Sequence, residues 1–214
     1  MRNREKILFV FSHPDDAEIY SGGLLLKLQY QFEVEVCIVF NISSDREIRE
    51  KEAKKSINVL GYTLSFLNMQ DGEIPDGLVL DCRINAMIEN SCPNLIITHN
   101  PRDYHTNHVL VSESVKRIAS YRIPVIYTDT LNGNDCMPDL FCDITDCMAK
   151  KIGLIKIHQS QIKKCNYINI CEIVNHYRGI QYFGKPEKYC EAYCMSSHYH
   201  LGQVAELINN VFKN

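Results

Sequence analysis

Several features that mark other protein classes are missing from this chain of 214 residues. No stretch approaches the roughly 18 consecutive apolar residues of a membrane-spanning helix, so the sequence predicts no membrane partner. Basic residues form no run longer than a pair such as Lys54–Lys55, and the net charge is −3, so no nucleic-acid partner is expected. Internal repeats, low-complexity tracts and linkers are also absent. Length and uniformity together predict a single domain over residues 1–214.

An export signal and a cysteine motif are missing as well. The N-terminus, MRNREK followed by a short apolar run, superficially resembles a signal peptide. That run ends in His13 and two aspartates rather than in a small-residue cleavage site, so it predicts a first strand and a cytoplasmic location. The ten cysteines include no Cys-x-x-Cys pair, so the spacing gives no support for a zinc knuckle or a thioredoxin-type site. We expect free thiols that act mainly as small apolar side chains.

Apolar segments of strand character alternate with segments of helical spacing. The expected strands are 7–12, 34–40, 63–67, 95–98 and 125–128, and the expected helices are 17–30, 46–60, 78–90 and 106–120. This alternation predicts an α/β, Rossmann-like three-layer fold, in which a mostly parallel sheet is flanked by helices. Beyond residue 130 we predict strands at 140–144 and 188–195, a helix over 146–164 and a C-terminal helix.

The run HPDDAE begins at His13, directly behind the first expected strand. Ligands bind at the carboxyl ends of the strands in an open parallel sheet, because the loops there form a crevice. His13 and one aspartate could hold a divalent metal while the other aspartate acts on a water molecule. As an alternative, Asp15 or Asp16 caps the following helix, which explains one aspartate but not the histidine as well. A glycine-rich phosphate loop, expected here in a Rossmann-type nucleotide enzyme, is absent.

A second polar loop follows the expected strand at 95–98. It contains His99, Asp103, His105 and His108. The last two histidines are three residues apart and share a face if a helix begins here. Two strand-tip loops that both concentrate histidine and aspartate indicate one shared site.

Together the two loops supply a possible metal centre. His13, Asp16 and His108 would provide three ligands and leave an open position for water, as a catalytic zinc site requires. Asp15 and His105 are then acid–base candidates beside that water. Zn2+ is the expected cofactor, and Fe2+ is possible because imidazole and carboxylate accept both ions.

In these motifs the chain resembles the PIG-L/LmbE-like zinc N-deacetylases. HPDD followed by Glu18, with a downstream His-x-x-His, is the specific part of the resemblance. Weaker matches extend it from about residue 5 to about residue 195: Gly22–Gly23, the segment 49–61, Asp71–Gly72, His158-x-Ser160-Gln161 and the segment 191–193.

The resemblance implies a hydrolase that removes an N-acyl group, acetyl above all, from an N-acylated amino sugar of the GlcNAc type. The attacking group would be a zinc-bound water. His13, Asp16 and His108 fall on the family's zinc ligands, and Asp15 falls on its general base. His105 falls on the histidine that stabilises the oxyanion or protonates the leaving amine. The partner would be a small-molecule amino sugar, and a homo-oligomer stays open.

Three further residues are candidates for substrate binding. Arg49 and Asp71 fall where family members hold sugar hydroxyls or an attached phosphate or acid group. Tyr104, next to His105, could hydrogen-bond the developing oxyanion.

One position departs from the family pattern, which usually reads His-Pro-Asp-His. Here Asn107 replaces the aspartate, and an amide orients a neighbouring histidine less strongly than a carboxylate does. Asp103 could supply the missing carboxylate from upstream. The second hypothesis is therefore a family member that binds a metal or a sugar with weak or no turnover.

For other histidines and aromatic residues we expect ordinary roles. His158 is expected to serve packing or a subunit contact rather than chemistry. Surface positions are expected for His176, His198 and His200, and core or rim positions for Tyr177, Tyr182, Phe183, Tyr189 and Tyr193.

Overall fold

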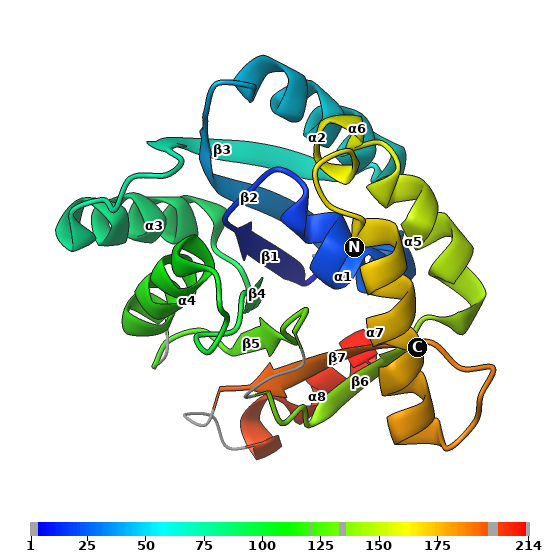
Figure 1. Cartoon of the computed structure of the whole chain (residues 1–214). Coiled ribbons are helices and arrows are strands. Elements are labelled where there is room, and N and C mark those ends of the chain that lie inside the picture. The colour runs from blue at the N-terminus through cyan, green and yellow to red at the C-terminus, as the bar shows by residue number, and fades with distance from the viewer. Residues whose placement is uncertain (1–3, 120, 133–135, 197–200, 213–214) are drawn as a thin grey trace.

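The computed structural model describes residues 4–119, 121–132, 136–196 and 201–212 (Figure 1). The strands are β1 (Lys6–Phe11), β2 (Glu33–Ile42), β3 (Thr63–Gln70), β4 (Leu95–Thr98), β5 (Val125–Thr128), β6 (Leu140–Asp143) and β7 (Cys190–Met195). The helices are α1 (Asp16–Leu28), α2 (Arg46–Leu60), α3 (Gly77–Ser91), α4 (Thr106–Ala119), α5 (Met148–Ile155), α6 (Gln159–Ile162), α7 (Tyr167–Phe183) and α8 (Leu201–Phe212), with a 3₁₀ turn at Thr145–Cys147.

All seven strands belong to one sheet in the order β3-β2-β1-β4-β5-β7-β6. The first five in that order pair in parallel, and β7 runs antiparallel to both β5 and β6. The chain moves from β1 outward to β3, then returns to place β4 on the other side of β1. The order of the strands therefore reverses between β1 and β4, which is where ligands bind in sheets of this type.

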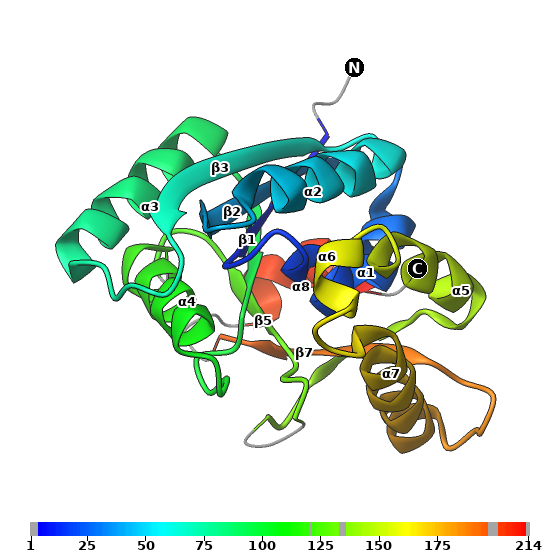
Figure 2. The same cartoon turned by 45° about the horizontal axis from the view of Figure 1, so that its top comes forward.

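Helices cover both faces of the sheet, as Figure 2 shows. On β1, Ile7, Phe9 and Phe11 pack in one apolar core with side chains from α1, α2, α5, α7 and α8. Leu8 and Val10 point to the opposite face and pack with α3 and α4. A strand buried on both faces is apolar at every position, which is why this segment reads as a continuous run. The predicted three-layer α/β fold is confirmed.

The second half of the chain departs from the expected elements. The prediction of one helix over 146–164 is wrong, because α5 ends at Ile155 and α6 begins only at Gln159. Between them the backbone of His158 is not helical (φ −80°, ψ 58°), and its side chain turns into the core. Helix α7 was not predicted. Periodicity along the chain does not reveal a break that is caused by a long-range side-chain contact.

Helix α1 is kinked, and the kink is held from the far end of the chain. Ser21 has non-helical angles (φ −136°, ψ 18°), so backbone N–H groups near it need other acceptors. The N–H groups of Gly23 and Leu24 donate to the buried carboxylate of Glu191 over 2.7 and 2.8 Å. Lys151, also fully buried, forms an ion pair with this carboxylate at 2.7 Å. The kink thereby joins the HPDDAE segment to β7 and α5.

All ten cysteines carry free thiols, as expected, and five of them are buried: Cys37, Cys136, Cys142, Cys171 and Cys190. Across the described part of the chain, no helix combines the length and the apolar character needed to cross a membrane. The described elements pack on one sheet, and the single-domain organisation stays a prediction.

Gly23→Ala should destabilise the protein, because there is no room for a side chain at the kink. An added Cβ would lie 2.3 Å from Cγ2 of Ile144 and 3.1 Å from Oε1 of Glu191. We expect urea unfolding to show a loss of about 1–3 kcal/mol, as for other overpacked sites. Gly153→Ala is the matched control, since nothing lies within 4 Å of its Cβ position in α5. It should gain about 0.5–1 kcal/mol. Equal unfolding free energies for the two variants would contradict this account.

Candidate functional site

Two loops that lie far apart in the sequence meet at the carboxyl ends of β1 and β4. The parallel pairing of these strands places Val10 beside Thr98, so that the loops after them leave from the same edge. The backbone N–H of Ser12 donates to Nε2 of His99 over 3.0 Å, which ties the two loops together. The structure thus brings the HPDDAE segment against residues 99–108, as the sequence analysis expected.

Three side chains from these loops form a triangle of ligand-type atoms. Nδ1 of His13 and Oδ2 of Asp16 are 3.3 Å apart, and Nε2 of His108 lies 3.4 Å from that nitrogen and 3.5 Å from that oxygen. All three residues are buried. Atoms held tetrahedrally at about 2.0–2.1 Å from a zinc ion lie about 3.3 Å apart. The triangle therefore fits a small divalent cation.

A carboxylate stands behind each of the two imidazoles. Nε2 of His13 is 3.3 Å from Oδ1 of Asp71, and Nδ1 of His108 is 3.2 Å from Oδ2 of Asp103. Such a partner fixes the tautomer of a histidine and turns its other nitrogen toward a metal. Asp103 therefore supplies a carboxylate to the second motif, as the sequence analysis suggested, and it acts on His108.

Asn107, the departure from the family pattern, has a definite partner. Its amide Nδ2 donates to Oδ1 of Asp71 over 2.9 Å and lies 3.3 Å from Nε2 of His13. Because an aspartate at this position would set two carboxylates against each other, the neutral amide suits the arrangement around Asp71. It supports the carboxylate that orients His13.

The charges of the cluster shift its pKa values strongly. Burial lowers the pKa of His13, but the carboxylates of Asp16 and Asp71 outweigh burial and raise it to about 10. Burial raises the pKa of Asp16, whereas His108, His99 and His13 bring it well below its usual range. Without a metal, a proton on His13 therefore compensates the carboxylates.

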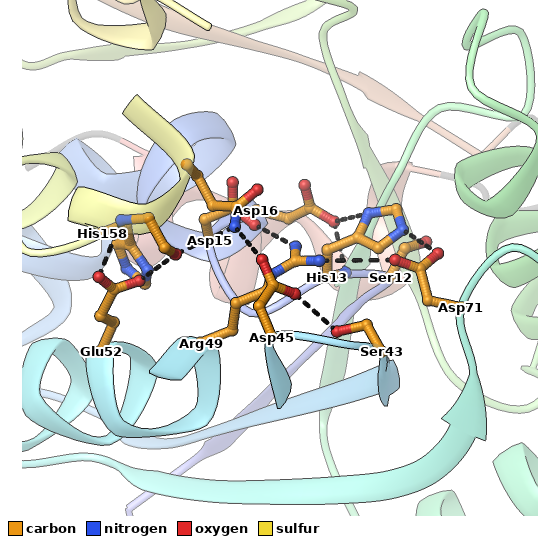
Figure 3. Close-up of polar contacts among 12 residues, drawn as sticks. Ser12, His13, Asp15, Asp16, Ser43, Asp45, Arg49, Glu52, Asp71 and His158 are labelled. Carbon is orange, nitrogen blue, oxygen red and sulfur yellow. Dashed lines mark hydrogen bonds and ion pairs between the residues drawn. The ribbon is translucent and has the colours of Figure 1, made fainter. Parts of the chain in front are cut away.

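Asp15 lies beside the triangle and is held by an arginine. Nη2 of Arg49 donates to Oδ1 of Asp15 over 3.0 Å, and Nη1 reaches Oδ2 of Asp71 at 3.5 Å. Figure 3 shows the guanidinium between these two carboxylates. Arg49 comes from α2, so this helix sets the position of Asp15.

His105 is the half-buried histidine of the group. Its ring centroid lies 4.9 Å from that of His13 and 4.5 Å from that of His108. Burial and the charges of His108 and His13 lower its pKa, which favours the neutral ring. The N–H of Asn107 donates to its Nδ1 over 3.2 Å, so the neutral ring carries its proton on Nε2.

A cavity of about 110 Å³ opens over these groups. Tyr104 lies at its edge and is 59% exposed. The lining also includes residues that were not predicted as site residues: Ile19, Tyr20, Leu131, Gln161 and Tyr167. The His-x-Ser-Gln pattern was the one feature of the sequence that could have indicated Gln161 as a site residue. Nothing in the sequence connected Leu131 or Tyr167 with the site.

Other residues have the following places. His99, which received no role from sequence, is fully buried with Nε2 3.1 Å from Oδ2 of Asp16. His158 is buried with Nε2 3.3 Å from Oε2 of Glu18, which agrees with packing and excludes the expected alternative of a subunit contact. Tyr193 is a core residue, and Tyr177 and Tyr182 are exposed on α7. His198 and His200 lie outside the described residues.

The His158–Glu18 pair should make the stability of the protein depend on pH. Burial lowers the pKa of His158, but the carboxylate of Glu18 outweighs it, and the net shift is upward. A raised pKa stabilises the fold fully below about pH 6.5, the value of an unfolded histidine, and this contribution is lost as pH rises through the folded value. His158→Gln should therefore cost more unfolding free energy at pH 6 than at pH 9.

Urea unfolding of both proteins across this range measures the difference. In a Glu18→Gln background, the same substitution should lose its pH dependence. A constant difference from pH 6 to pH 9 would show that the pair does not carry the effect.

Comparison of the sequence with known proteins identifies a family and relatives of this chain. The family PIG-L, described as GlcNAc-PI de-N-acetylase, matches residues 8–119. A Bacillus cereus protein named as a probable N-acetyl-alpha-D-glucosaminyl L-malate deacetylase 2 is 27% identical over 183 residues, which cover 72% of this chain and 83% of that protein.

Several solved structures share the fold. The N,N'-diacetylchitobiose deacetylase of Pyrococcus horikoshii superposes with a TM-score of 0.75 at 22% identity, covering 96% of this chain and 90% of that one. The 4-carboxy-2-hydroxymuconate hydratase GalB of Pseudomonas putida also has a TM-score of 0.75, at 18% identity, covering 89% and 95%. Because one of these enzymes is a hydratase, the fold alone does not decide the reaction.

Proposed function

Because the chain belongs to the PIG-L family of GlcNAc-PI de-N-acetylases, we propose that it is a metal-dependent hydrolase of N-acylated amino sugars. The family description and the name of the B. cereus relative both specify removal of an acetyl group from a GlcNAc-type compound. The observation that carries the proposal is the triangle of His13, Asp16 and His108 with Asp15 beside it.

The metal ligands in this proposal are Nδ1 of His13, Oδ2 of Asp16 and Nε2 of His108. The pairing of both imidazoles with carboxylates, Asp71 and Asp103, supports this choice. When bound, Zn2+ or Fe2+ supplies Lewis-acid chemistry, which lowers the pKa of a coordinated water and polarises the acyl carbonyl. Imidazole and carboxylate ligands accept either ion.

Asp15 is the general base of the proposed reaction. Arg49 holds Oδ1 of Asp15, which leaves Oδ2 to take a proton from the water that attacks the acyl carbon. The same proton is then available to the amine nitrogen as the C–N bond breaks. The products are a carboxylic acid and the free amino sugar.

His105 stabilises the oxygen of the acyl group as negative charge develops on it. Its Nδ1 accepts the N–H of Asn107, so Nε2–H is the donor that faces the reacting group. A neutral imidazole suffices for this role, in keeping with the lowered pKa of His105. Tyr104, at the edge of the cavity, is proposed as a second donor to the substrate.

Arg49 and Asp71 are proposed to bind the sugar, and their contacts give each a further role. Arg49 orients Asp15, and Asp71 orients His13. A substrate hydroxyl bound between them would therefore lie next to both the base and a metal ligand. The alternative is a family member that binds a metal or a sugar with weak or no turnover. The hydrogen bond from Asn107 to Asp71 supports the hydrolase over this alternative, because the amide complements the carboxylate that orients His13.

Release of free amine from N-acetylglucosamine derivatives should require both the metal and Asp15. We expect activity in zinc-loaded protein, loss on chelation, and a fall in kcat of about 10²- to 10⁴-fold in Asp15→Asn, the range of general-base catalysis. Asp146→Asn, an exposed carboxylate on the 3₁₀ turn, is the matched control and should keep full activity. Activity that survives both chelation and Asp15→Asn would contradict the mechanism.

Zinc binding should release a proton at pH 7, because His13, with its pKa of about 10, is protonated in the metal-free protein. Calorimetric titration in two buffers of different ionisation enthalpy measures the number released. His13→Gln should lose tight zinc binding together with the proton release. His105→Gln should retain both, since that residue is not a ligand and its pKa is lowered. Unchanged zinc affinity in His13→Gln would remove this residue from the ligand set.

A further inference from the structure

The cavity has a wall that the reaction described above does not use. Its metal side comes from residues within the family match at 8–119, whereas Leu131, Gln161 and Tyr167 come from later in the chain. Gln161 lies on the short helix α6 and is 8% exposed. A side-chain amide has a donor end, the NH₂ group, and an acceptor end, the carbonyl oxygen. The end that faces the cavity therefore decides whether the amide binds an acceptor or a donor group of a ligand.

Helix α6 is fixed against α2 by hydrogen bonds that begin at Ser160. The hydroxyl of Ser160 donates to Oε2 of Glu52 over 2.6 Å, and its backbone N–H donates to Oε1 of Glu52 over 2.9 Å. A serine hydroxyl has one proton to donate. Since this proton is directed to Glu52, Oγ of Ser160 can act only as an acceptor toward its other neighbours.

The amide of Gln161 meets two acceptors. Its Nε2 lies 3.0 Å from Oγ of Ser160 and 3.4 Å from Oδ2 of Asp45. The hydrogen bond from Lys164 lowers the pKa of Asp45 to about 2, so this carboxyl group stays ionised and cannot donate. Figure 3 shows Asp45 beside Arg49, with Ser43 donating to it. Both neighbours of the amide are therefore acceptors, and the NH₂ end must face them.

One polar atom of Gln161 then remains for the cavity, its carbonyl oxygen Oε1. A carbonyl on the wall accepts a hydrogen bond from an O–H or N–H group and repels an anionic oxygen. The orientation of the amide is set before any ligand arrives, because its NH₂ group bonds to Ser160 and Asp45 and Ser160 is itself held by Glu52. Pre-orientation of this kind lowers the entropic cost of binding.

We propose that Gln161 is a substrate-binding residue, whose side-chain carbonyl accepts a hydrogen bond from a ring hydroxyl of the amino sugar. The inference rests on the proposed function, which places the N-acyl group at the metal side of the same cavity. Leu131 and Tyr167 line the same cavity, are partly buried and add apolar surface to it. The wall thus selects a neutral, hydroxyl-bearing sugar ring.

The test compares Gln161→Met with wild-type protein on methyl N-acetylglucosaminide and its 3-, 4- and 6-deoxy analogues. Methionine keeps the length of the side chain and removes the acceptor. In wild type, one deoxy analogue should lose roughly ten-fold in kcat/KM, the value of one hydrogen bond to a buried group. Gln161→Met should lose a similar factor on the parent sugar, mainly in KM, and show no further loss on that analogue.

Gln159→Met is the matched control, since Gln159 is an exposed glutamine on the same helix and donates to the carbonyl of Lys156. It should discriminate between the parent sugar and the deoxy analogues as wild type does. If Gln161→Met discriminates equally well, or lowers kcat/KM by one factor on every sugar, the residue is structural and the proposal fails while the proposed function stands.

Binding of the same four sugars, followed by ligand-observed NMR, covers the case in which wild type releases no amine. A hydroxyl preference that disappears in Gln161→Met would support the role of Gln161 without turnover, and a preference that persists would overturn it. If the protein neither binds nor hydrolyses any of the four, the amino-sugar assignment and the role of Gln161 fall together.

Discussion

The parallel pairing of β1 with β4 is the constraint on which the site depends. It sets Val10 beside Thr98, so that the loops after the two strands leave the sheet side by side. The hydrogen bond from Ser12 to His99 then locks one loop to the other. Since the strand order reverses at this pair, no crossover helix covers the edge, and a cavity can form there. A shift of register between the strands would separate His13 from His108.

The site is a set of buried charges that compensate one another. Asp15 is paired with Arg49, Asp71 with His13, and Asp103 with His108. A buried charge is tolerated when it is paired and hydrogen-bonded, and each of these carboxylates meets that condition. The neutral amide at position 107 follows from the same logic, because Asp71 already supplies the negative charge. A proton on His13, whose pKa is raised by Asp16 and Asp71, supplies positive charge where a divalent cation does so in the proposed enzyme.

The two halves of the chain have different tasks. The triangle of His13, Asp16 and His108, which we propose as the metal ligands, and Asp15 lie within residues 8–119, the part that the family match covers. The later residues support and enclose it, since Glu191 holds the kink of α1 and α6 brings Gln161 to the cavity. The hydratase that shares the fold shows that the scaffold permits other chemistry. The proposal made for Gln161 gives the later part of the chain a share in substrate choice, beside Arg49 and Asp71.

What the sequence by itself determined is local or periodic. Apolar runs separated by helical segments were sufficient to predict the order of the first nine elements, because a strand that is buried on both faces is apolar at every position. The placement of His13, Asp15 and Asp16 at a strand end was also readable, since a polar loop directly behind an apolar run has few alternatives. Only the tertiary structure decided which atoms meet. It assigned Asp103 to His108, turned His158 inward to Glu18 and ended α5 before it, and placed Gln161 on the cavity wall. Each of these arrangements depends on contacts between residues far apart in the chain, and such contacts cannot be predicted from a local sequence pattern.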